Sequence, residues 1–401
     1  MLRPTLAPAL VMALSIGPAA VAQEPEPEVF ADGLDFPTNA AFAPDGRLFF
    51  TEKNTGRVRV VEGGRLLPEP FTQVPSTRTA ESGLLGIALH PDFEREPWVY
   101  LTYSSRETGR NELIRVRADD NVGGETEALL QLPEVSPYHD GGDLAFGPDG
   151  RLFVVTGEAH NPARAQDPGD LAGKVLRLEP DGSAADNPLP GPVYSMGHRN
   201  SFGICVDPET GNVWQTENGP TTNDEVNLIE PGGNYGWPVV RGAAGDPRFV
   251  DPQIDFEEII VPTGCAIYPH PHLGSQSEGA LFFGDYGGRL WRVVLNEERD
   301  AVERFHQLRT GLGDITDVLV GPDERLYVVT SQRILRLPAR VESPEPGPSP
   351  ETPGPTEPGP VDVPSVPGDG DRGDVPWLLL TGLGVILGVA AAVWFARRGS
   401  I

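Results

Sequence analysis

Three short segments of the chain combine residue types that can do chemistry on a bound ligand. The first runs from Tyr138 to Asp143 and reads YHDGGD, with two glycines that let a ligand come close to the backbone. A histidine titrates near pH 6.5, so His139 can accept a proton at neutral pH. A histidine in such a place is also often a surface residue or a hydrogen-bonded core residue. The position alone favours that ordinary role over catalysis.

The second segment, Met196 to Gly203, reads MGHRNSFG. Its Arg199 and Asn200 offer several hydrogen-bond donors in a fixed arrangement, which suits an anionic or carbonyl-bearing ligand. The alternative is a structural ion pair, and without further context that is the commoner use of such an arginine. The segment is therefore a candidate binding site that needs support from its position in the fold.

The third segment is a long loop, Glu217 to Glu225, followed by Gly233 to Pro238 with the sequence GNYGWP. Carboxylates, amides and free carbonyls supply the six to eight oxygen ligands that calcium prefers. A solvated acidic loop is the alternative. The sequence has no Cys/His spacing for zinc and no glycine-rich phosphate loop, serine-nucleophile motif or nucleic-acid motif.

A repeat positions these segments. Apolar residues, a proline, an acidic turn and a second apolar run recur six times, at intervals of 47 to 61 residues, around Pro44, Pro91, Pro148, Pro208, Pro269 and Pro322. Pro-Asp-Gly favours a tight turn, and the flanking runs alternate with period two, so each copy predicts a β-hairpin. No sustained helical periodicity is present between the two ends of the chain.

Six copies of about 50 residues predict an all-β fold, a six-bladed β-propeller with one four-stranded sheet per blade. An array of β-sandwiches is the rival, but it would not repeat one hairpin so evenly. His139 directly precedes the third copy, and Arg199 and Asn200 directly precede the fourth. They therefore occupy equivalent positions on neighbouring blades, and we expect them to meet at one end of the central channel together with Gly219 and Pro220.

The composition excludes some partners. A net charge of −27 argues against nucleic acid and against docking on anionic lipid, and it is consistent with calcium and neutral substrates. The two cysteines, Cys205 and Cys265, lie three and four residues before their repeat prolines. Because side chains alternate along a strand, we expect them on opposite faces of neighbouring blades and therefore not disulfide-bonded.

The two ends of the chain predict export and anchoring. Residues 1–22 resemble a secretory signal peptide, and residues 24–341 form the propeller. A proline-rich stalk follows at 342–375, although such a stretch could also be a ligand for proline-binding modules. Residues 376–396 are long and apolar enough for a transmembrane helix, and the tail at 397–401 carries Arg397 and Arg398. The protein is thus expected in the cytoplasmic membrane, with the propeller outside and the C-terminus in the cytoplasm.

The stretches GLDFPTNAAFAPDG, ESGLLGIALHPDF, HDGGDLAFGPDG, GHRNSFG and ENGPTTNDEVNLIEPGGNYGWP carry a resemblance. From about residue 30 to residue 337 the chain resembles the soluble glucose and aldose sugar dehydrogenases that depend on pyrroloquinoline quinone (PQQ). The resemblance implies a six-bladed propeller that oxidises C1 of an aldose to a lactone. It also implies PQQ as the hydride acceptor, calcium as a Lewis acid and a protein that accepts the electrons.

The resemblance assigns roles to eight residues. The general base falls on His139. The contacts to the quinone fall on Arg199, on Asn200 and on Glu81, taken as the position after the first strand of the second blade. The carbonyls that hold the cofactor calcium fall on Gly219 and Pro220, and a second calcium site falls on Glu225 and Tyr235.

The sequence departs from the family where positive charge is expected. The family lysine shortly before the second strand of blade five falls on Gly287, and two arginines entering blade six fall on Asp314 and Thr316. A further arginine falls on Asp143. These changes predict an acidic pocket with weak affinity for a tricarboxylate, unless Arg289 or Arg309 compensates.

Two main hypotheses follow from this combination. One is a membrane-tethered sugar dehydrogenase that uses PQQ and calcium. The other is a calcium-stabilised propeller that has lost the quinone and binds a sugar or a protein. A lactone-hydrolysing propeller is a third, but the expected carboxylate and asparagine ligands of a catalytic metal are missing.

Overall fold

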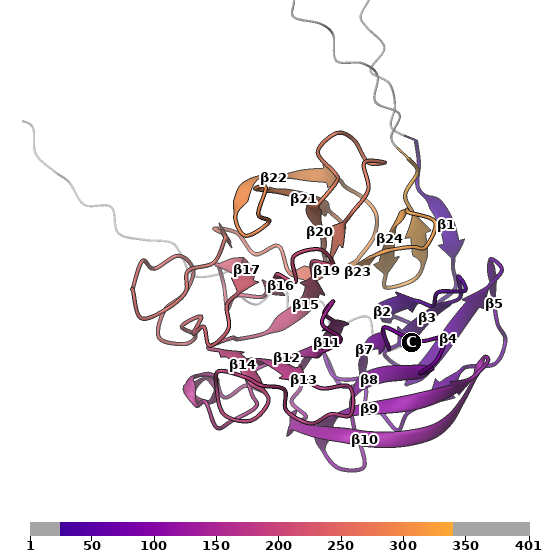
Figure 1. The fold of residues 1–401 in the computed structure, drawn as a ribbon, viewed down its shortest axis with the longest axis horizontal. Coiled ribbons are helices and arrows are strands. Elements are labelled where there is room, and N and C mark those ends of the chain that lie inside the picture. The colour runs from indigo at the N-terminus through magenta and orange to yellow at the C-terminus, as the bar shows by residue number, and fades with distance from the viewer. Residues whose placement is uncertain (1–24, 340–401) are drawn as a thin grey trace, which may run out of the picture.

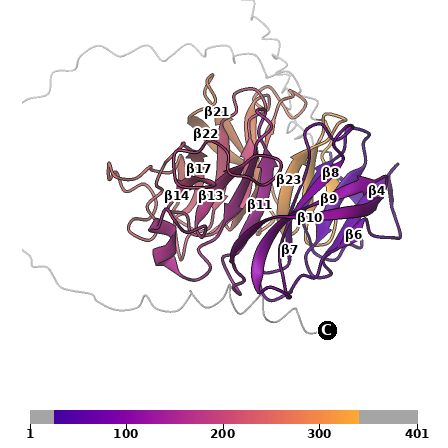
Figure 2. The same ribbon diagram turned by 60° about the horizontal axis from the view of Figure 1, so that its bottom comes forward.

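The computed structural model describes residues 25–339, and nearly all of the regular structure there is β. Twenty-five strands form six antiparallel sheets, and the single helical element of this part is a short 3₁₀ turn at Pro162–Gln166. Figure 1 shows the sheets arranged like blades around a central axis. The tilted view of Figure 2 shows them standing next to one another around that axis. The expected six-bladed propeller is therefore observed.

The blades follow one another in sequence. The first consists of β2 (Pro37–Phe42), β3 (Leu48–Glu52), β4 (Arg57–Glu62), β5 (Arg65–Leu66) and the short β6 (Thr72–Gln73). The second consists of β7 (Leu84–Leu89), β8 (Trp98–Ser104), β9 (Arg110–Asp119) and β10 (Val122–Glu134). The third consists of β11 (Gly141–Phe146), β12 (Leu152–Thr156), β13 (Lys174–Leu178) and β14 (Val193–Met196).

The other three blades have four strands each. The fourth consists of β15 (Ser201–Val206), β16 (Val213–Glu217), β17 (Asp224–Ile229) and β18 (Ile254–Phe256). The fifth consists of β19 (Pro262–Tyr268), β20 (Ala280–Asp285), β21 (Leu290–Leu295) and β22 (Val302–Arg309). The sixth consists of β23 (Ile315–Val320), β24 (Leu326–Thr330), β25 (Ile334–Arg336) and the strand β1 (Glu28–Ala31).

Each copy of the repeat forms the first two strands of a blade, as the hairpin prediction required. In the first copy the turn after Pro44 is closed by the N–H of Gly46, which donates to the carbonyl of Ala43 at 2.9 Å. Gly46 has φ +89°, a conformation that glycine adopts at little cost. The first strand of every blade lies innermost, next to the first strands of its two neighbours. The loops that precede these strands therefore open at one end of the central channel.

The sixth blade is completed from the beginning of the chain. Strand β1 pairs antiparallel with β25, with Val29 opposite Leu335. Arg336 and Glu28 add an ion pair at 3.1 Å. The repeat pattern does not predict this closure, because β1 stands outside any copy of the repeat.

Apolar side chains fill the spaces between neighbouring blades. Phe49, Ile87 and Val99 belong to one such cluster between the first two blades, and all three are buried. The second strand of each blade is covered on both faces, which is why β3, β8 and β12 are buried along their whole length. Burying a phenylalanine or valine in this way contributes roughly 1.5–3 kcal/mol to stability.

The prediction that the cysteines stay unpaired is wrong. Cys205 and Cys265 form a disulfide, with 5.7 Å between their Cα atoms. They lie on the innermost strands β15 and β19 and share one apolar cluster. Neighbouring blades pack face to face, so one face of a blade meets the opposite face of the next. Side chains of opposite parity on adjacent blades therefore converge.

The signal peptide, the stalk, the transmembrane helix and the tail, expected at residues 1–22, 342–375, 376–396 and 397–401, lie outside the described residues. Residues 24, 340 and 341 of the expected propeller domain do as well. Within 25–339 no helix is long and apolar enough to cross a membrane.

Candidate active site

His139 lies in the loop before β11, at one end of the central channel. Its backbone has φ +65°, a left-handed conformation that is uncommon for residues other than glycine. The N–H of His139 donates to Oε2 of Glu81 at 2.7 Å, and the residue is only 8% exposed. The loop therefore holds the imidazole rigidly against the beginning of the second blade.

The hydrogen bonds of His139 determine which ring nitrogen carries the proton. Nδ1 bonds the carboxylate of Glu158, and Nε2 lies 3.0 Å from Nη2 of Arg199. A guanidinium can only donate, so Nε2 must accept and Nδ1 must carry the proton. Burial lowers the pKa of His139, the hydrogen bond to Glu158 opposes this, and the charge of Arg199 adds to it. At neutral pH the ring is thus a neutral base with its lone pair on Nε2.

Arg199 connects this base to the long loop of the fourth blade. Its Nη1 donates to the carbonyls of Asn218 at 2.7 Å and Gly219 at 2.9 Å. Its backbone N–H donates to Glu217, and its guanidinium lies 5.4 Å from the ring centroid of Trp237. Burial lowers the pKa of Arg199. His139, Arg199 and Gly219 are therefore in one hydrogen-bonded group.

Asn200 and Glu81 belong to the same group. Nδ2 of Asn200 donates to Oε2 of Glu81 at 3.3 Å. Burial raises the pKa of Glu81 to about 7, although the hydrogen bonds from His139 and Asn200 act in the opposite direction. Glu81 precedes β7, the first strand of the second blade, and does not follow it as expected. It can reach the site because the loops before the innermost strands all lie at this end of the channel.

The predicted calcium ligands divide into two places. Gly219 and Pro220 are half-buried in the loop between β16 and β17, and the carbonyl of Gly219 already accepts from Arg199. Glu225 lies on β17 and accepts from the N–H of Gly242 at 3.0 Å. The hydroxyl of Tyr235 donates to the carbonyl of Leu228 at 2.5 Å. Glu225 and Tyr235 thus have separate hydrogen-bond partners.

Between residues 25 and 339, no three carboxylate, imidazole or thiol groups are grouped so that they could hold a metal ion. A calcium site there must take most of its ligands from carbonyl and amide oxygens. Such atoms are available: Oδ1 of Asn200 and Oδ1 of Asn218 are buried beside Arg199 without a hydrogen-bond partner. The oxygens present are therefore of the kind that calcium binds.

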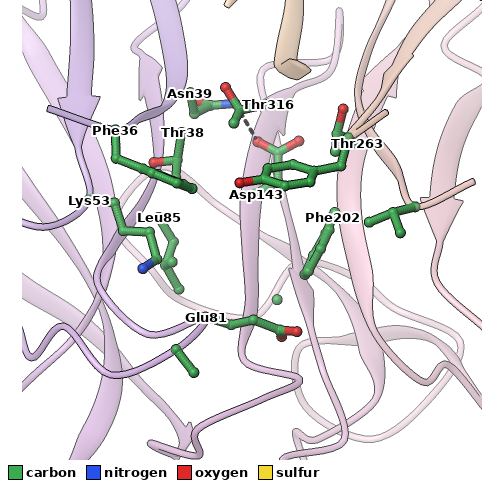
Figure 3. A pocket seen from close by; sticks show the side chains of 14 residues that line it. Phe36, Thr38, Asn39, Lys53, Glu81, Leu85, Asp143, Phe202, Thr263 and Thr316 are labelled. Atoms are coloured by element: carbon green, nitrogen blue, oxygen red, sulfur yellow. Dashed lines mark hydrogen bonds between the residues drawn. The ribbon is translucent and has the colours of Figure 1, made fainter. Parts of the chain in front are cut away.

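A cavity opens beside Glu81, with about 710 Å³ of space outside atoms, part of it solvent. Figure 3 shows Phe36 and Phe202 on its walls and the side chains of Lys53 and Glu81 facing the same space. Four residues that carry hydroxyl groups also line it: Thr38, Thr263, Thr316 and Tyr286. The hydroxyl of Thr263 is buried and has no partner. Aromatic walls, hydroxyls and one ammonium suit a flat, polar, anionic ligand.

Of the four positions where the family would have a lysine or an arginine, only two line this cavity. Asp143 and Thr316 line it. The carboxylate of Asp314 instead accepts from the hydroxyl of Ser331 at 3.2 Å. Gly287 lies in the turn after β20, the second strand of blade five, and not before that strand as expected. Only two of the four departures therefore bear directly on a bound ligand.

Neither arginine that we considered as compensation lines the cavity. Arg289 pairs with Asp285 at 2.5 Å, and Arg309 donates to the carbonyl of Pro25 at 2.7 Å. Lys53, which we did not single out, is the cation that does. The sequence marks Lys53 only weakly. It directly follows the second strand of the first repeat, and none of the other copies has a lysine there.

Two buried carboxyl groups lie deeper in the channel, Asp143 on β11 and Asp317 on β23. Asp143 accepts from Nδ2 of Asn39 at 2.9 Å and from the N–H of Ile204 at 2.8 Å. Burial raises the pKa of Asp143 to about 7. Burial, and then the charge of Asp143, raise the pKa of Asp317 well above its ordinary value. Near neutral pH the pair therefore holds a proton, and the channel is less negative than its residues suggest.

This pair predicts a pH-dependent stability. A carboxyl whose pKa is raised on folding stabilises the protein below its unfolded pKa, near 4, and that stabilisation is lost as the pH rises through the folded pKa. Replacing Asp317 by Asn should remove one such group. The difference in unfolding free energy between variant and wild type should then move in favour of the variant between pH 5 and 7, by up to about 1.4 kcal/mol per pH unit.

Urea unfolding at several pH values measures this difference. The substitution also removes a hydrogen-bond acceptor, which lowers the unfolding free energy by the same amount at every pH. This shifts the whole curve of unfolding free energy against pH and leaves its slope unchanged. Asp246→Asn is the control, because Asp246 is paired with Arg248 at the surface and its pKa is lowered to about 2. Parallel curves for wild type and Asp317→Asn would contradict the shared proton.

Comparison with known proteins covers the same region. A family model described as Glucose / Sorbosone dehydrogenase matches residues 34–337. The aldose sugar dehydrogenase YliI of Escherichia coli (strain K12) is 30% identical over 334 residues, covering 76% of this chain and 90% of that relative.

Two solved structures superpose over the whole propeller. A putative oxidoreductase (glucose dehydrogenase) of Thermus thermophilus gives a TM-score of 0.72 with 38% identity, covering 78% of this chain and 99% of that one. The PQQ-bound aldose sugar dehydrogenase of Streptomyces coelicolor gives a TM-score of 0.71 with 32% identity, covering 78% and 97%. The likeness therefore includes every blade.

Proposed function

This chain belongs to the glucose/sorbosone dehydrogenase family, and we propose that it oxidises C1 of an aldose to the lactone with PQQ and calcium. The observation that carries the proposal is the state of His139. Its proton is held on Nδ1 by Glu158, and its Nε2 lone pair faces the group formed by Arg199 and Asn200. A neutral, oriented imidazole is what removal of a sugar hydroxyl proton requires.

The residues of the cavity fit the quinone. Lys53 lines the cavity and is a cation for the carboxylates of the quinone, and the unpartnered hydroxyl of Thr263 is available as a hydrogen-bond donor. Arg199 is a second cation, outside the lining, in the hydrogen-bonded group of His139 and Glu81. Phe36 and Phe202 provide apolar walls for a flat ring system. When bound, PQQ would accept the hydride equivalent that leaves C1. The two raised carboxyl pKa values, at Glu81 and Asp143, reduce the repulsion that the acidic residues would otherwise cause.

The roles of the chain's own residues follow from their contacts. His139 takes the proton of the C1 hydroxyl at Nε2, and the Glu158 carboxylate stabilises the imidazolium that results. Nη2 of Arg199 donates to Nε2 of His139 and so keeps this nitrogen unprotonated. The hydroxyl of the sugar would take the place of Nη2 there. Gly219 and Pro220 would bind calcium through their carbonyls, a change that requires Arg199 to release the carbonyl of Gly219.

A titration of the full chain, purified in detergent, with PQQ tests the proposal. We expect a quinone absorption band that depends on calcium, followed by reduction of the quinone when an aldose is added. Binding of an aldose without any binding of quinone would instead favour the second hypothesis, a propeller that binds sugar without oxidising it. The four sequence departures, at Gly287, Asp314, Thr316 and Asp143, are the observation behind that alternative.

We also propose that the protein is exported and anchored, with the propeller outside the cytoplasmic membrane and electrons passed to an acceptor protein. The support is in the sequence: a signal-peptide pattern at 1–22 and an apolar run at 376–396 followed by two arginines. Full-length protein should partition into a detergent phase, and a chain ending at Glu342 should not. Recovery of both in the aqueous phase would exclude the anchor.

A further inference from the structure

The chain contains only two lysines, Lys53 and Lys174, among its 31 basic residues. Both are buried, at 7% and 0% exposure. Surface positive charge is thus carried by arginine. Each lysine is buried, so its surroundings must stabilise its ammonium group.

Lys174 shows how this fold stabilises a structural lysine. Its Nζ donates to three backbone carbonyls, those of Arg164 at 3.0 Å, Ala165 at 3.1 Å and Ala172 at 2.6 Å. All three donors of the ammonium are satisfied. Lys174 therefore needs no ligand.

The backbone and side-chain stem of Lys53 are also fixed by their neighbours, but its ammonium lacks the hydrogen-bond partners that Lys174 has. Its N–H donates to the carbonyl of Phe36 at 3.0 Å, and its own carbonyl accepts from Leu84 of the next blade at 3.3 Å. A Cβ on Gly83 would lie 2.4 Å from Cγ of Lys53, so glycine there makes room for the stem. Within residues 25–339 the Nζ atom has no hydrogen bond or ion pair, and it lies 5.2 Å from the ring centroid of Phe36.

The surroundings of this ammonium are a ligand cavity and distant carboxylates. Lys53 lines the same cavity as Glu81, and Figure 3 shows it above and to the left of Glu81. Burial lowers its pKa to about 8, while the charges of Glu81, Asp140 and Asp35 act in the opposite direction. The ammonium is therefore mostly charged at pH 7, and it is partly desolvated and unpaired. Such a cation gains most from an anion that enters the cavity.

We propose that Lys53 binds a carboxylate of the ligand in this cavity. It would supply, from blade one, positive charge that the sequence lacks at Gly287, Asp314 and Thr316. The inference rests on the proposed function in taking PQQ as the ligand, but the chemistry it requires is only that of a planar aromatic polycarboxylate.

The test compares wild type, Lys53→Met and Lys53→Arg in the full chain with calcium. Two probes are titrated: PQQ, followed by its absorption, and benzene-1,3,5-tricarboxylate, a redox-inactive aromatic carboxylate, followed by calorimetry. Loss of a charged hydrogen bond should weaken PQQ roughly 10- to 100-fold in Lys53→Met. Lys53→Arg should recover part of the affinity. Arg248→Met is the control, because it removes one positive charge from the surface, where Arg248 pairs with Asp246.

A second readout identifies the ammonium itself. In protein labelled with ¹⁵N-lysine only two side-chain signals are expected, and PQQ should shift that of Lys53 and leave that of Lys174 unchanged. The affinity of wild type for PQQ should also fall as the pH rises through the titration of Lys53. The fall should be smaller in Lys53→Met, where the carboxyl groups of Glu81 and Asp143 are the groups lining the cavity that still titrate near this range.

The outcomes separate the two proposals. If Lys53→Met binds PQQ as tightly as wild type does, the role of Lys53 is wrong and the dehydrogenase proposal stands. If wild type binds the benzene tricarboxylate through Lys53 but does not bind PQQ, Lys53 is an anion site and the dehydrogenase proposal fails. If wild type binds neither probe, both are wrong.

Discussion

Replacing His139 by Gln is expected to lower kcat for aldose oxidation by roughly two to four orders of magnitude, the range usual for removing a general base. Glutamine retains a side chain of similar length and can still hydrogen-bond Glu158, but it has no basic nitrogen. Binding of quinone should change little, because His139 is not among the residues that line the cavity. Steady-state kinetics and a quinone titration on the same preparation measure both effects.

A neighbouring histidine provides a matched control. The ring of His160 lies 4.7 Å from that of His139 but is exposed, so His160→Gln should retain most of the activity. In wild type, activity should rise with pH as His139 loses its proton, with a midpoint below 6.5 because burial lowers the pKa. Full activity of His139→Gln would remove His139 from the mechanism.

Removal of the disulfide is expected to have the largest effect on stability. The bridge closes a segment with a sequence separation of 60 residues, for which chain entropy predicts a stabilisation of about 4 kcal/mol. The double variant Cys205→Ala, Cys265→Ala should lose about that much in unfolding free energy, and its activity at low temperature should persist. Guanidinium unfolding followed by intrinsic fluorescence measures the loss.

Reducing agent separates the bridge from the packing of the two side chains. Wild type should become less stable when a thiol is added, whereas the double variant should be unaffected. Equal stability of wild type with and without reductant, after complete reduction, would show that the bridge contributes nothing.

The architecture was predictable because the repeat contains its own turn. Pro44, Asp45 and Gly46 specify a hairpin, and six such hairpins leave few folds other than a propeller. The convergence of His139 with Arg199 was predictable for the same reason, since both stand before the first strand of a blade. These inferences depend on local sequence and on the order of the copies.

Errors arose where the contact between blades decides the result. Side-chain alternation puts Cys205 and Cys265 on opposite faces of their own strands, but the packing of one blade on the next turns opposite faces toward each other. The sequence does not single out Lys53, because its importance comes from a cavity that residues of several blades form together. Neither fact is contained in a single repeat.

The pairing of β1 with β25 has a consequence for how the protein comes apart. In an open array of repeats the terminal units have one neighbour each, and unfolding can begin there and proceed inward. In this ring every blade has two neighbours, and the strands at Glu28–Ala31 and Ile334–Arg336 hold each other in place. Fraying at either end therefore requires opening the same pair of strands. Loss of the short N-terminal strand should thus destabilise the whole ring. We expect lower cooperativity of unfolding and faster amide exchange in β23, β24 and β25.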